Sequence, residues 1–174
     1  VLDLSHTGRR ATLEIMERSA HPCVFSHSNP AAVVPNPRNI DDEQLLACAR
    51  GGGVMGVCSW GPLVMKPGTS TRPTLDDYID LMDYVADRTG SRANVGISTD
   101  MSIGTYPQHE SDVWGNIPFP NITADYDRHV TDDFTSPERN VAGFDDYAQI
   151  IAVAEALSRR GYSDGDVRAI LGEN

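Results

Sequence analysis

The sequence predicts an α/β fold with a parallel sheet, and two observations carry this prediction. Four short, Val-rich apolar runs are bounded by polar or glycine positions, as expected of strands buried on both faces. They alternate with segments in which apolar residues recur every three or four positions, the period of a helix with one buried face. The predicted strands are residues 1–5, 23–26, 54–60 and 95–98.

The predicted helices are recognised by their apolar stripes and by residues that suit their ends. Thr74 is of the type that caps the start of a helix, Gly90 suits the end of the same helix, and Asp41 or Asp42 can begin the one before. Ser163 suits the start of the last helix. The predicted helices lie at residues 13–20, 43–50, 75–89, 143–160 and 164–171.

The alternation of strands and helices implies right-handed crossovers and a sheet covered by helices. Two architectures fit four such strand-helix units: a doubly wound open sheet, and one half of an eight-stranded (β/α)8 barrel. The stretch from Met101 to Asn140 has little periodicity and is rich in Pro, Gly, Asp and Asn. It therefore predicts a long loop after the last strand, where barrel enzymes place substrate contacts.

Composition and charge are those of an ordinary globular protein and exclude some partners. The 174 residues, 40% hydrophobic and 22% charged, suit a single domain over residues 1–174. A net charge of −11 argues against nucleic acid and anionic membranes as partners, because both would repel the chain. Without an apolar run of ~20 residues or a signal peptide, we expect a cytoplasmic protein. Because Val1 begins a predicted strand and is not Met, we also expect residues before it.

Polar residues at the carboxyl ends of the predicted strands are the first candidates for a functional site, because both architectures place their sites there. They are His6, His27, Trp60 and Asp100. Two imidazoles at adjacent strand ends would converge on one point, which suits zinc or another borderline metal. The alternative is that each histidine is a hydrogen-bonded structural residue.

Several motifs together resemble the renal (membrane) dipeptidase family in order and spacing, over nearly the whole chain. They are DLSH (3–6), PCVFSHSNP (22–30), PRN (37–39), VGISTD (95–100) and the ending from Tyr147 to Asn174. The resemblance implies a metal-dependent (β/α)8 barrel of which this chain is the C-terminal half, with about four strand-helix units, the long loop and the C-terminal helices.

The resemblance also implies a site of two zinc ions that this chain supplies in part. His6 and His27 match the two histidines of the second ion, whereas the His-x-Asp pair of the first ion and the bridging Glu have no match here. Arg38 matches the arginine that grips the dipeptide carboxylate, a task for which its fork of donors is suited. Asp100 matches an aspartate near the metals that handles the substrate amine or the departing nitrogen, and we expect it to accept a proton during catalysis.

The implied reaction is zinc-dependent hydrolysis of dipeptides by a hydroxide that bridges the two ions. The implied partners are a dipeptide substrate and the N-terminal half of the barrel, on the same or a separate chain, with a homodimer as the complete assembly. We expect the chain alone to be inactive. Two alternatives remain open: a barrel of this type that acts on another amide or a lactone, and a non-catalytic fragment that needs its complementary half.

Overall fold

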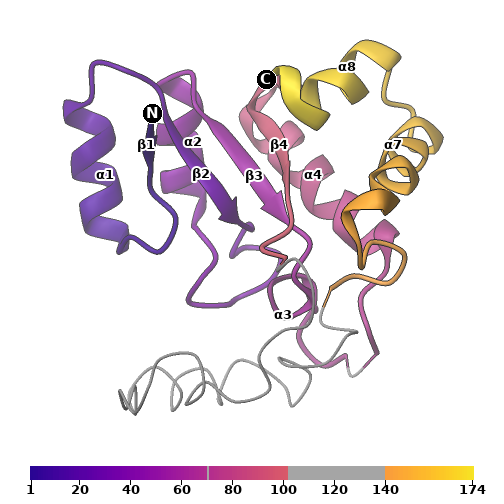
Figure 1. Ribbon diagram of the computed structural model, residues 1–174. Helices are drawn as coiled ribbons and strands as arrows, with labels where there is room; N and C mark the ends of the chain where they lie inside the picture. The colour runs from indigo at the N-terminus through magenta and orange to yellow at the C-terminus, as the bar shows by residue number, and fades with distance from the viewer. Residues whose placement is uncertain (70, 102–139) are drawn as a thin grey trace, which may run out of the picture.

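The computed structural model describes residues 1–69, 71–101 and 140–174, which Figure 1 draws in colour. The loop predicted between Met101 and Asn140 lies outside the described residues except at its two ends.

Four parallel strands form one sheet in the order β1-β2-β3-β4 (Figure 1). They are β1 (Leu2–Asp3), β2 (Cys23–Ser28), β3 (Val54–Cys58) and β4 (Val95–Ser98). A doubly wound sheet reverses its strand order at a switch point, whereas successive strands of a barrel lie side by side. The structure thus confirms the α/β class and the parallel sheet, and its strand order fits part of a barrel.

Helices follow the strands, and each long helix contacts the next along the chain. They are α1 (Arg9–Arg18), α2 (Asp42–Arg50), α4 (Leu75–Thr89), α7 (Ile150–Arg159) and α8 (Asp164–Arg168), with short turns α3 (Gly61–Val64), η1 (Arg92–Asn94), η3 (Tyr147–Gln149) and η4 (Ala169–Glu173). Among the described residues, no helix combines the length and apolar character that a membrane crossing requires.

Capping side chains fix where the helices begin. Asp41, rather than Asp42, caps α2, and Thr74 and Ser163 cap α4 and α8, each in a complete capping box. The helix predicted from residue 143 begins later than expected. Asp146 accepts a hydrogen bond from the backbone N–H of Ala148, so helical structure starts at Tyr147.

The core lies between the sheet and the helices, and one expectation about it is wrong. Leu4 and Phe25 are buried, but Leu2 is 51% exposed and Asp3 and Ser26 are exposed, so β1 and β2 are not buried on both faces. Successive side chains of a strand point to opposite faces, and among the described elements the helices lie on the face that holds Leu4 and Phe25, so Asp3 and Ser26 on the other face are exposed. In addition, β1 is an edge strand and has a neighbour on one side alone.

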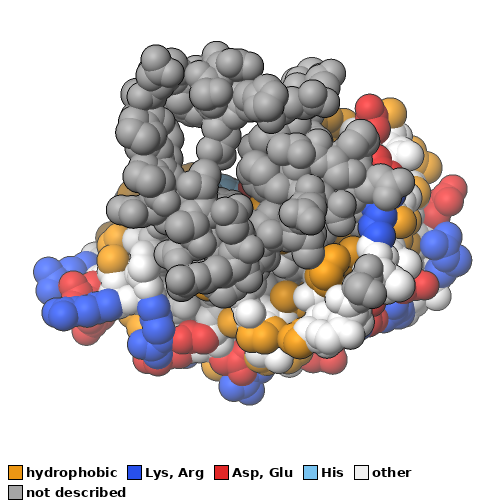
Figure 2. Space-filling model, turned by 90° about the horizontal axis from the view of Figure 1, so that it is seen from below, with side chains coloured by type: hydrophobic (Ala, Val, Ile, Leu, Met, Phe, Trp, Pro, Cys, Tyr) orange, Lys and Arg blue, Asp and Glu red, His pale blue; other side chains and the backbone are white. Residues whose placement is uncertain are grey.

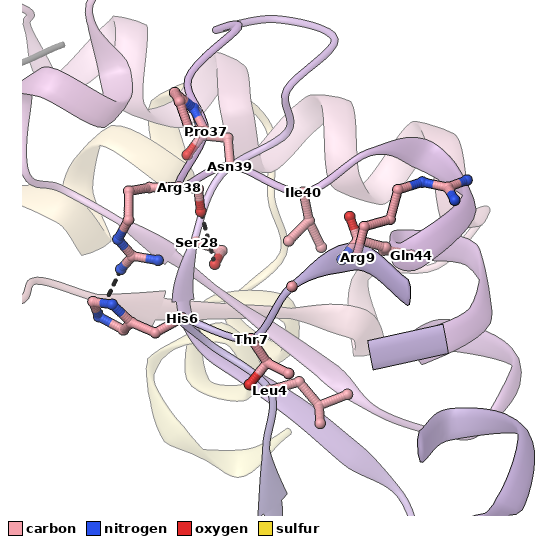
Figure 3. Close-up of a pocket in the computed structure, with 11 residues that line it drawn as sticks. Leu4, His6, Thr7, Arg9, Ser28, Pro37, Arg38, Asn39, Ile40 and Gln44 are labelled. Atoms are coloured by element: carbon pink, nitrogen blue, oxygen red, sulfur yellow. Dashed lines mark hydrogen bonds between the residues drawn. The ribbon is translucent and has the colours of Figure 1, made fainter. Parts of the chain in front are cut away.

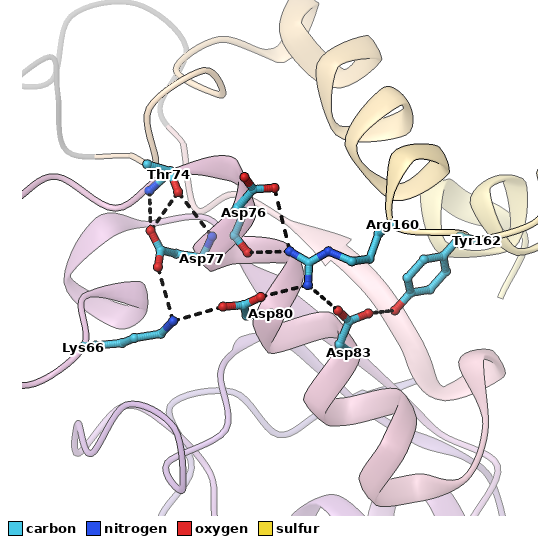
Figure 4. A network of polar contacts seen from close by, with 8 residues as sticks. All are labelled: Lys66, Thr74, Asp76, Asp77, Asp80, Asp83, Arg160 and Tyr162. Carbon is cyan, nitrogen blue, oxygen red and sulfur yellow. Dashed lines mark hydrogen bonds and ion pairs between the residues drawn. The ribbon is translucent and has the colours of Figure 1, made fainter.

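An ionic network joins α4 to the C-terminal helices across a long separation in sequence (Figure 4). The Arg160 guanidinium lies 2.8 Å from an Asp80 oxygen and 2.7 Å from an Asp83 oxygen. Tyr162 donates a hydrogen bond of 2.7 Å to Asp83, and Lys66 pairs with Asp80 at 3.0 Å. A network of this kind holds the last helices against α4 more firmly than one exposed ion pair would.

Candidate functional site

Two imidazole rings meet at the carboxyl ends of β1 and β2. His6 follows β1, His27 lies near the end of β2, and their Nε2 atoms are 2.8 Å apart. The ring centroids are 4.8 Å apart and the planes are inclined by 57°. The structure therefore brings together the two histidines that the sequence singled out, from adjacent strands of a rigid sheet.

A loop between β2 and α2 carries Arg38 to the same place, and two buried asparagines hold this loop. The side chain of Asn29 donates to the carbonyl oxygens of Cys58 (2.9 Å) and Leu63 (3.0 Å) and accepts from the Cys58 N–H (2.8 Å). Asn39 accepts from the backbone N–H of Asn29 at 3.1 Å and donates to the Val34 carbonyl at 2.8 Å. These bonds fix the start of the loop at Asn29 and its backbone at Asn39, the residue that follows Arg38.

Replacing Asn29 with Ala is expected to lower the free energy of unfolding by about 2–4 kcal/mol, because a buried N–H and two carbonyls lose their partner. Urea denaturation of the native polypeptide measures this. Asn94→Ala is the matched control, since Asn94 is half-buried and donates one bond, to Gly53. Its loss should cost about 1 kcal/mol. Equal effects of the two substitutions would contradict the role given to Asn29.

The Arg38 side chain reaches back to the imidazole pair and borders a cavity (Figure 3). Its Nη2 donates to His6 Nε2 at 2.8 Å, and its buried Nε has no hydrogen-bond partner among the described residues. The cavity beside it has a volume of about 210 Å³ and is lined mainly by polar groups, among them Thr7, Ser28 and Gln44. This space adjoins both His6 and Arg38, so a small polar ligand there would contact both.

Backbone conformation distinguishes two of the predicted site residues. Among the described residues, His6 (φ 59°) and Asp100 (φ 54°) are the non-glycine residues with positive φ. Such left-handed conformations are uncommon for residues with a Cβ and are concentrated at functional sites. His6 and Asp100 follow β1 and β4, the first and last of the described strands in the sheet.

Electrostatics keep His6 neutral near pH 7. Burial lowers the pKa of His6, the charges of Arg38 and His27 lower it further, and Asp100 and Asp3 act in the opposite direction. Neutral imidazole is the form that binds a metal. The effect of Asp100 on His6 places its charge within reach of the pair, although no described hydrogen bond joins Asp100 to His6, His27 or Arg38.

The geometry of the two Nε2 atoms tests whether the imidazole pair fits a metal. His6 Nε2 accepts from Arg38, which can only donate, so its lone pair faces the site. Two imidazole nitrogens on a tetrahedral zinc would lie about 3.3 Å apart, given Zn–N bonds of about 2.0–2.1 Å. The observed distance of 2.8 Å between the Nε2 atoms is shorter, so the two rings would have to separate slightly to hold an ion between them. Within residues 1–69, 71–101 and 140–174 no cluster of three or more His, Cys, Asp or Glu side chains is placed to hold a metal. The fit is that of a partial site.

The remaining surface around the carboxyl ends has mixed charge. Seen from below, Lys and Arg side chains lie beside Asp and Glu side chains around the visible rim (Figure 2). The ion pairs of Arg9 with Asp41 and of Arg10 with Glu14 have this character. Trp60, the remaining strand-end candidate, is buried with Cys58 and Leu63 in a small apolar cluster.

Some residues of the site were missed by sequence reasoning even though they stand in the quoted motifs. Asn29 lies within the PCVFSHSNP motif and Asn39 ends the PRN motif, and both anchor the loop that presents Arg38. Asp3, in DLSH, and Ser26, in PCVFSHSNP, are hydrogen-bonded to each other beside His27. Motif membership was the one signal in the sequence that could have identified them.

Comparison with known proteins connects this chain to dipeptidases. A family model described as membrane dipeptidase (peptidase family M19) matches residues 1–125. Dipeptidase verJ of Clonostachys rogersoniana is 26% identical over 174 residues, which cover 100% of this chain and 35% of that protein. Dipeptidase ataJ of Aspergillus terreus is 34% identical over 100 residues, which cover 58% of this chain and 24% of that protein.

Solved structures show the same fold. An amidohydrolase from Pseudomonas aeruginosa superimposes with a TM-score of 0.77 at 29% identity, over 99% of this chain and 50% of that one. A metallopeptidase from Rhodobacter sphaeroides, liganded with a phosphinate mimic of the dipeptide L-Ala-D-Ala, superimposes with a TM-score of 0.72 at 22% identity. The match covers 99% of this chain and 40% of that one.

The fold and the similar structures first define a class: an α/β chain whose parallel sheet fits part of a barrel. The chain belongs to the membrane dipeptidase family, peptidase family M19, because the family model matches most of its length. It spans between a quarter and a half of the lengths of the relatives described above.

Proposed function

We propose that this chain supplies part of the active site of a zinc-dependent dipeptidase, in which His6 and His27 hold one of two metal ions. The observation that carries the proposal is that the Nε2 atoms of His6 and His27 lie 2.8 Å apart and that Arg38 donates a hydrogen bond to the one in His6. When bound, zinc supplies Lewis-acid polarisation of the peptide carbonyl and activation of water. Another segment has to complete the ligand set, because two imidazoles leave a tetrahedral ion half coordinated.

Arg38 is proposed to bind the terminal carboxylate of the dipeptide. The single lone pair of His6 Nε2 serves either Arg38 or a metal, so the guanidinium gives up this bond when a metal uses that nitrogen. Its donors, including the unpaired Nε, are then available for a bidentate bond to a carboxylate. The cavity beside His6 and Arg38 gives that carboxylate a place next to the imidazole pair.

Asp100 is proposed to accept a proton from the attacking water and to pass it to the departing amine. It is exposed at the end of β4, where its charge already acts on His6. A carboxylate near a cation keeps its charged form, which is the form that accepts a proton.

Replacing Arg38 with Ala should lower kcat/KM for a dipeptide by about 100-fold, since a charge-assisted bidentate bond contributes about 2–3 kcal/mol. Steady-state kinetics on dipeptides and on their C-terminal amides measures this. The loss should be concentrated on substrates with a free carboxylate. Arg38→Lys is the matched control and should recover part of the activity, because Lys keeps the positive charge but cannot form the bidentate hydrogen bond of a guanidinium. An equal loss on acids and amides would contradict the assignment.

A second candidate is hydrolysis of another amide or a lactone, and the similarity to the Pseudomonas aeruginosa amidohydrolase favours it. A panel of dipeptides, N-acylated amino acids and lactones, assayed with the native polypeptide and zinc, separates the two. The proposed function predicts the highest kcat/KM among the dipeptides. A higher kcat/KM for acylated amino acids or lactones would show that these compounds, and not dipeptides, are the substrates.

The rest of the barrel is the proposed partner of this chain. Val1 and Leu2 are exposed on the outer side of β1, and an uncovered edge strand offers unpaired N–H and C=O groups to another strand. We propose that strands from the N-terminal half, on the same or a separate polypeptide, pair with β1 and β4. The complete protein is proposed to be a homodimer, and the chain alone to be inactive. Intact mass of the native protein tests whether the N-terminal half is on the same polypeptide, light scattering tests the homodimer, and a dipeptidase assay of the isolated chain tests its inactivity.

A further inference from the structure

The carboxylate of Asp3 collects three hydrogen bonds at the end of β1. Its Oδ1 accepts from the backbone N–H groups of Ser5 (3.0 Å) and Ser26 (3.1 Å), and its Oδ2 accepts from the Ser26 hydroxyl at 2.5 Å. Burial raises the pKa of Asp3, but the hydrogen bonds from Ser26 and Ser5 outweigh burial and lower it to about 2. At neutral pH Asp3 is therefore ionised and can only accept.

The hydroxyl of Ser26 lies between Asp3 and His27 and has one hydrogen to give. Asp3 takes that hydrogen, and Ser26 Oγ is also 2.7 Å from His27 Nδ1. The contact between Ser26 and His27 is a hydrogen bond only if Nδ1 carries the proton and donates it. In a neutral ring this leaves a lone pair on His27 Nε2. Because His6 Nε2 also carries a lone pair, which accepts from Arg38, the 2.8 Å contact between the two Nε2 atoms is then not a hydrogen bond but two lone pairs that face each other, an arrangement suited to a shared cation.

We propose that Asp3 and Ser26 are positioning residues that fix the tautomer of His27 and so make its Nε2 available to the metal. The inference rests on the proposed function, in which His27 is a ligand. Outer partners of this kind orient metal-binding histidines, and their loss typically reduces metal affinity by about 10–100-fold. The His27 backbone is held as well, because its N–H donates to Ser5 Oγ at 3.0 Å.

The substitution Asp3→Asn tests the inference because it reverses the direction of this chain of hydrogen bonds with little change of shape. Two backbone N–H groups point at Oδ1, so the carbonyl oxygen of Asn takes that place and the amide nitrogen faces Ser26. Ser26 Oγ then accepts from Asn, and its own hydrogen turns to His27 Nδ1. The proton of His27 is forced onto Nε2, where it blocks a metal.

The first measurement is the tautomer of His27 in the metal-free native polypeptide, labelled with 15N in histidine and observed by long-range 1H–15N NMR. The wild type is expected to carry the proton on Nδ1 and Asp3→Asn on Nε2. The second measurement is zinc affinity by competition with a chelator, where Asp3→Asn should weaken binding by about 10–100-fold. Asp87→Asn, an exposed change of the same charge on α4, is the control and should alter neither result.

The variants Ser26→Ala and Ser26→Thr provide a second test, which holds even if the Asp3→Asn variant fails to fold. Alanine removes the acceptor of Nδ1–H, so His27 should become a mixture of tautomers and bind zinc about 10-fold more weakly. Threonine keeps the hydroxyl and should restore both properties. A wild-type proton on Nε2, or a tautomer that neither Asp3→Asn nor Ser26→Ala changes, would overturn the inference. A tautomer that shifts while zinc affinity stays constant would instead overturn the proposed role of His27 as a ligand.

Discussion

Replacing His27 with Ala is expected to reduce zinc affinity by more than about 100-fold and kcat/KM for dipeptides by about 1,000-fold or more. The expected loss of zinc affinity exceeds the roughly 10–100-fold effect of removing a residue that only hydrogen-bonds to a ligand, because here the ligand itself is removed. The expected loss of kcat/KM follows from the several kcal/mol that a catalytic metal contributes, at about 1.36 kcal/mol for each tenfold change in rate. Metal analysis and steady-state kinetics on the native polypeptide measure the two effects.

His21→Ala is the matched control for this experiment. His21 is exposed and precedes β2, at the opposite end of that strand from His27. Its replacement should leave both zinc content and activity unchanged. If His27→Ala kept its zinc and its activity, the assignment of His27 as a ligand would be wrong.

Replacing Asp100 with Asn is expected to lower kcat by about 100- to 10,000-fold, the usual contribution of a positioned proton acceptor. Asn has nearly the same shape as Asp but cannot accept and return the proton. Zinc affinity should change little, because no described hydrogen bond links Asp100 to the imidazole pair. Steady-state kinetics, with zinc measured on the same samples, provides both numbers.

Asp164→Asn controls for the loss of one negative charge, since Asp164 is exposed on α8. It should leave kcat unchanged. Loss of zinc together with activity in Asp100→Asn would show that Asp100 acts as a ligand, which would contradict its assignment as the proton acceptor.

The sequence predicted the features of the fold that depend on local periodicity. The four apolar runs became β1 to β4, and Thr74 and Ser163 cap helices where their side chains suggested. The order of strands in the sheet was left between two architectures, because apolar spacing alone does not say which strands are neighbours. The exposure of Leu2 was not predicted, because the sequence pattern of an apolar residue in a strand does not distinguish an edge strand from a central one.

For the candidate site, residue positions were predictable and their interactions were not. His6, His27 and Arg38 were singled out, and the structure brings them into contact. The left-handed backbone of His6 and Asp100 has only a weak signature in residue type, because neither is glycine, although His and Asp adopt this conformation more often than most residues with a Cβ. The bonds of Asp3 to Ser26 and of Asn29 to Cys58 depend on a register between strands that is fixed only when the sheet forms.

The most direct measurement is anomalous X-ray diffraction, recorded above and below the zinc absorption edge, from crystals of the native protein grown with zinc. If both histidines are ligands, we expect an anomalous peak about 2.0–2.1 Å from Nε2 of both His6 and His27, with Arg38 no longer bonded to His6. A peak bound through Nδ1 of either ring, or the absence of a peak between the two rings while zinc is bound elsewhere, would contradict this assignment.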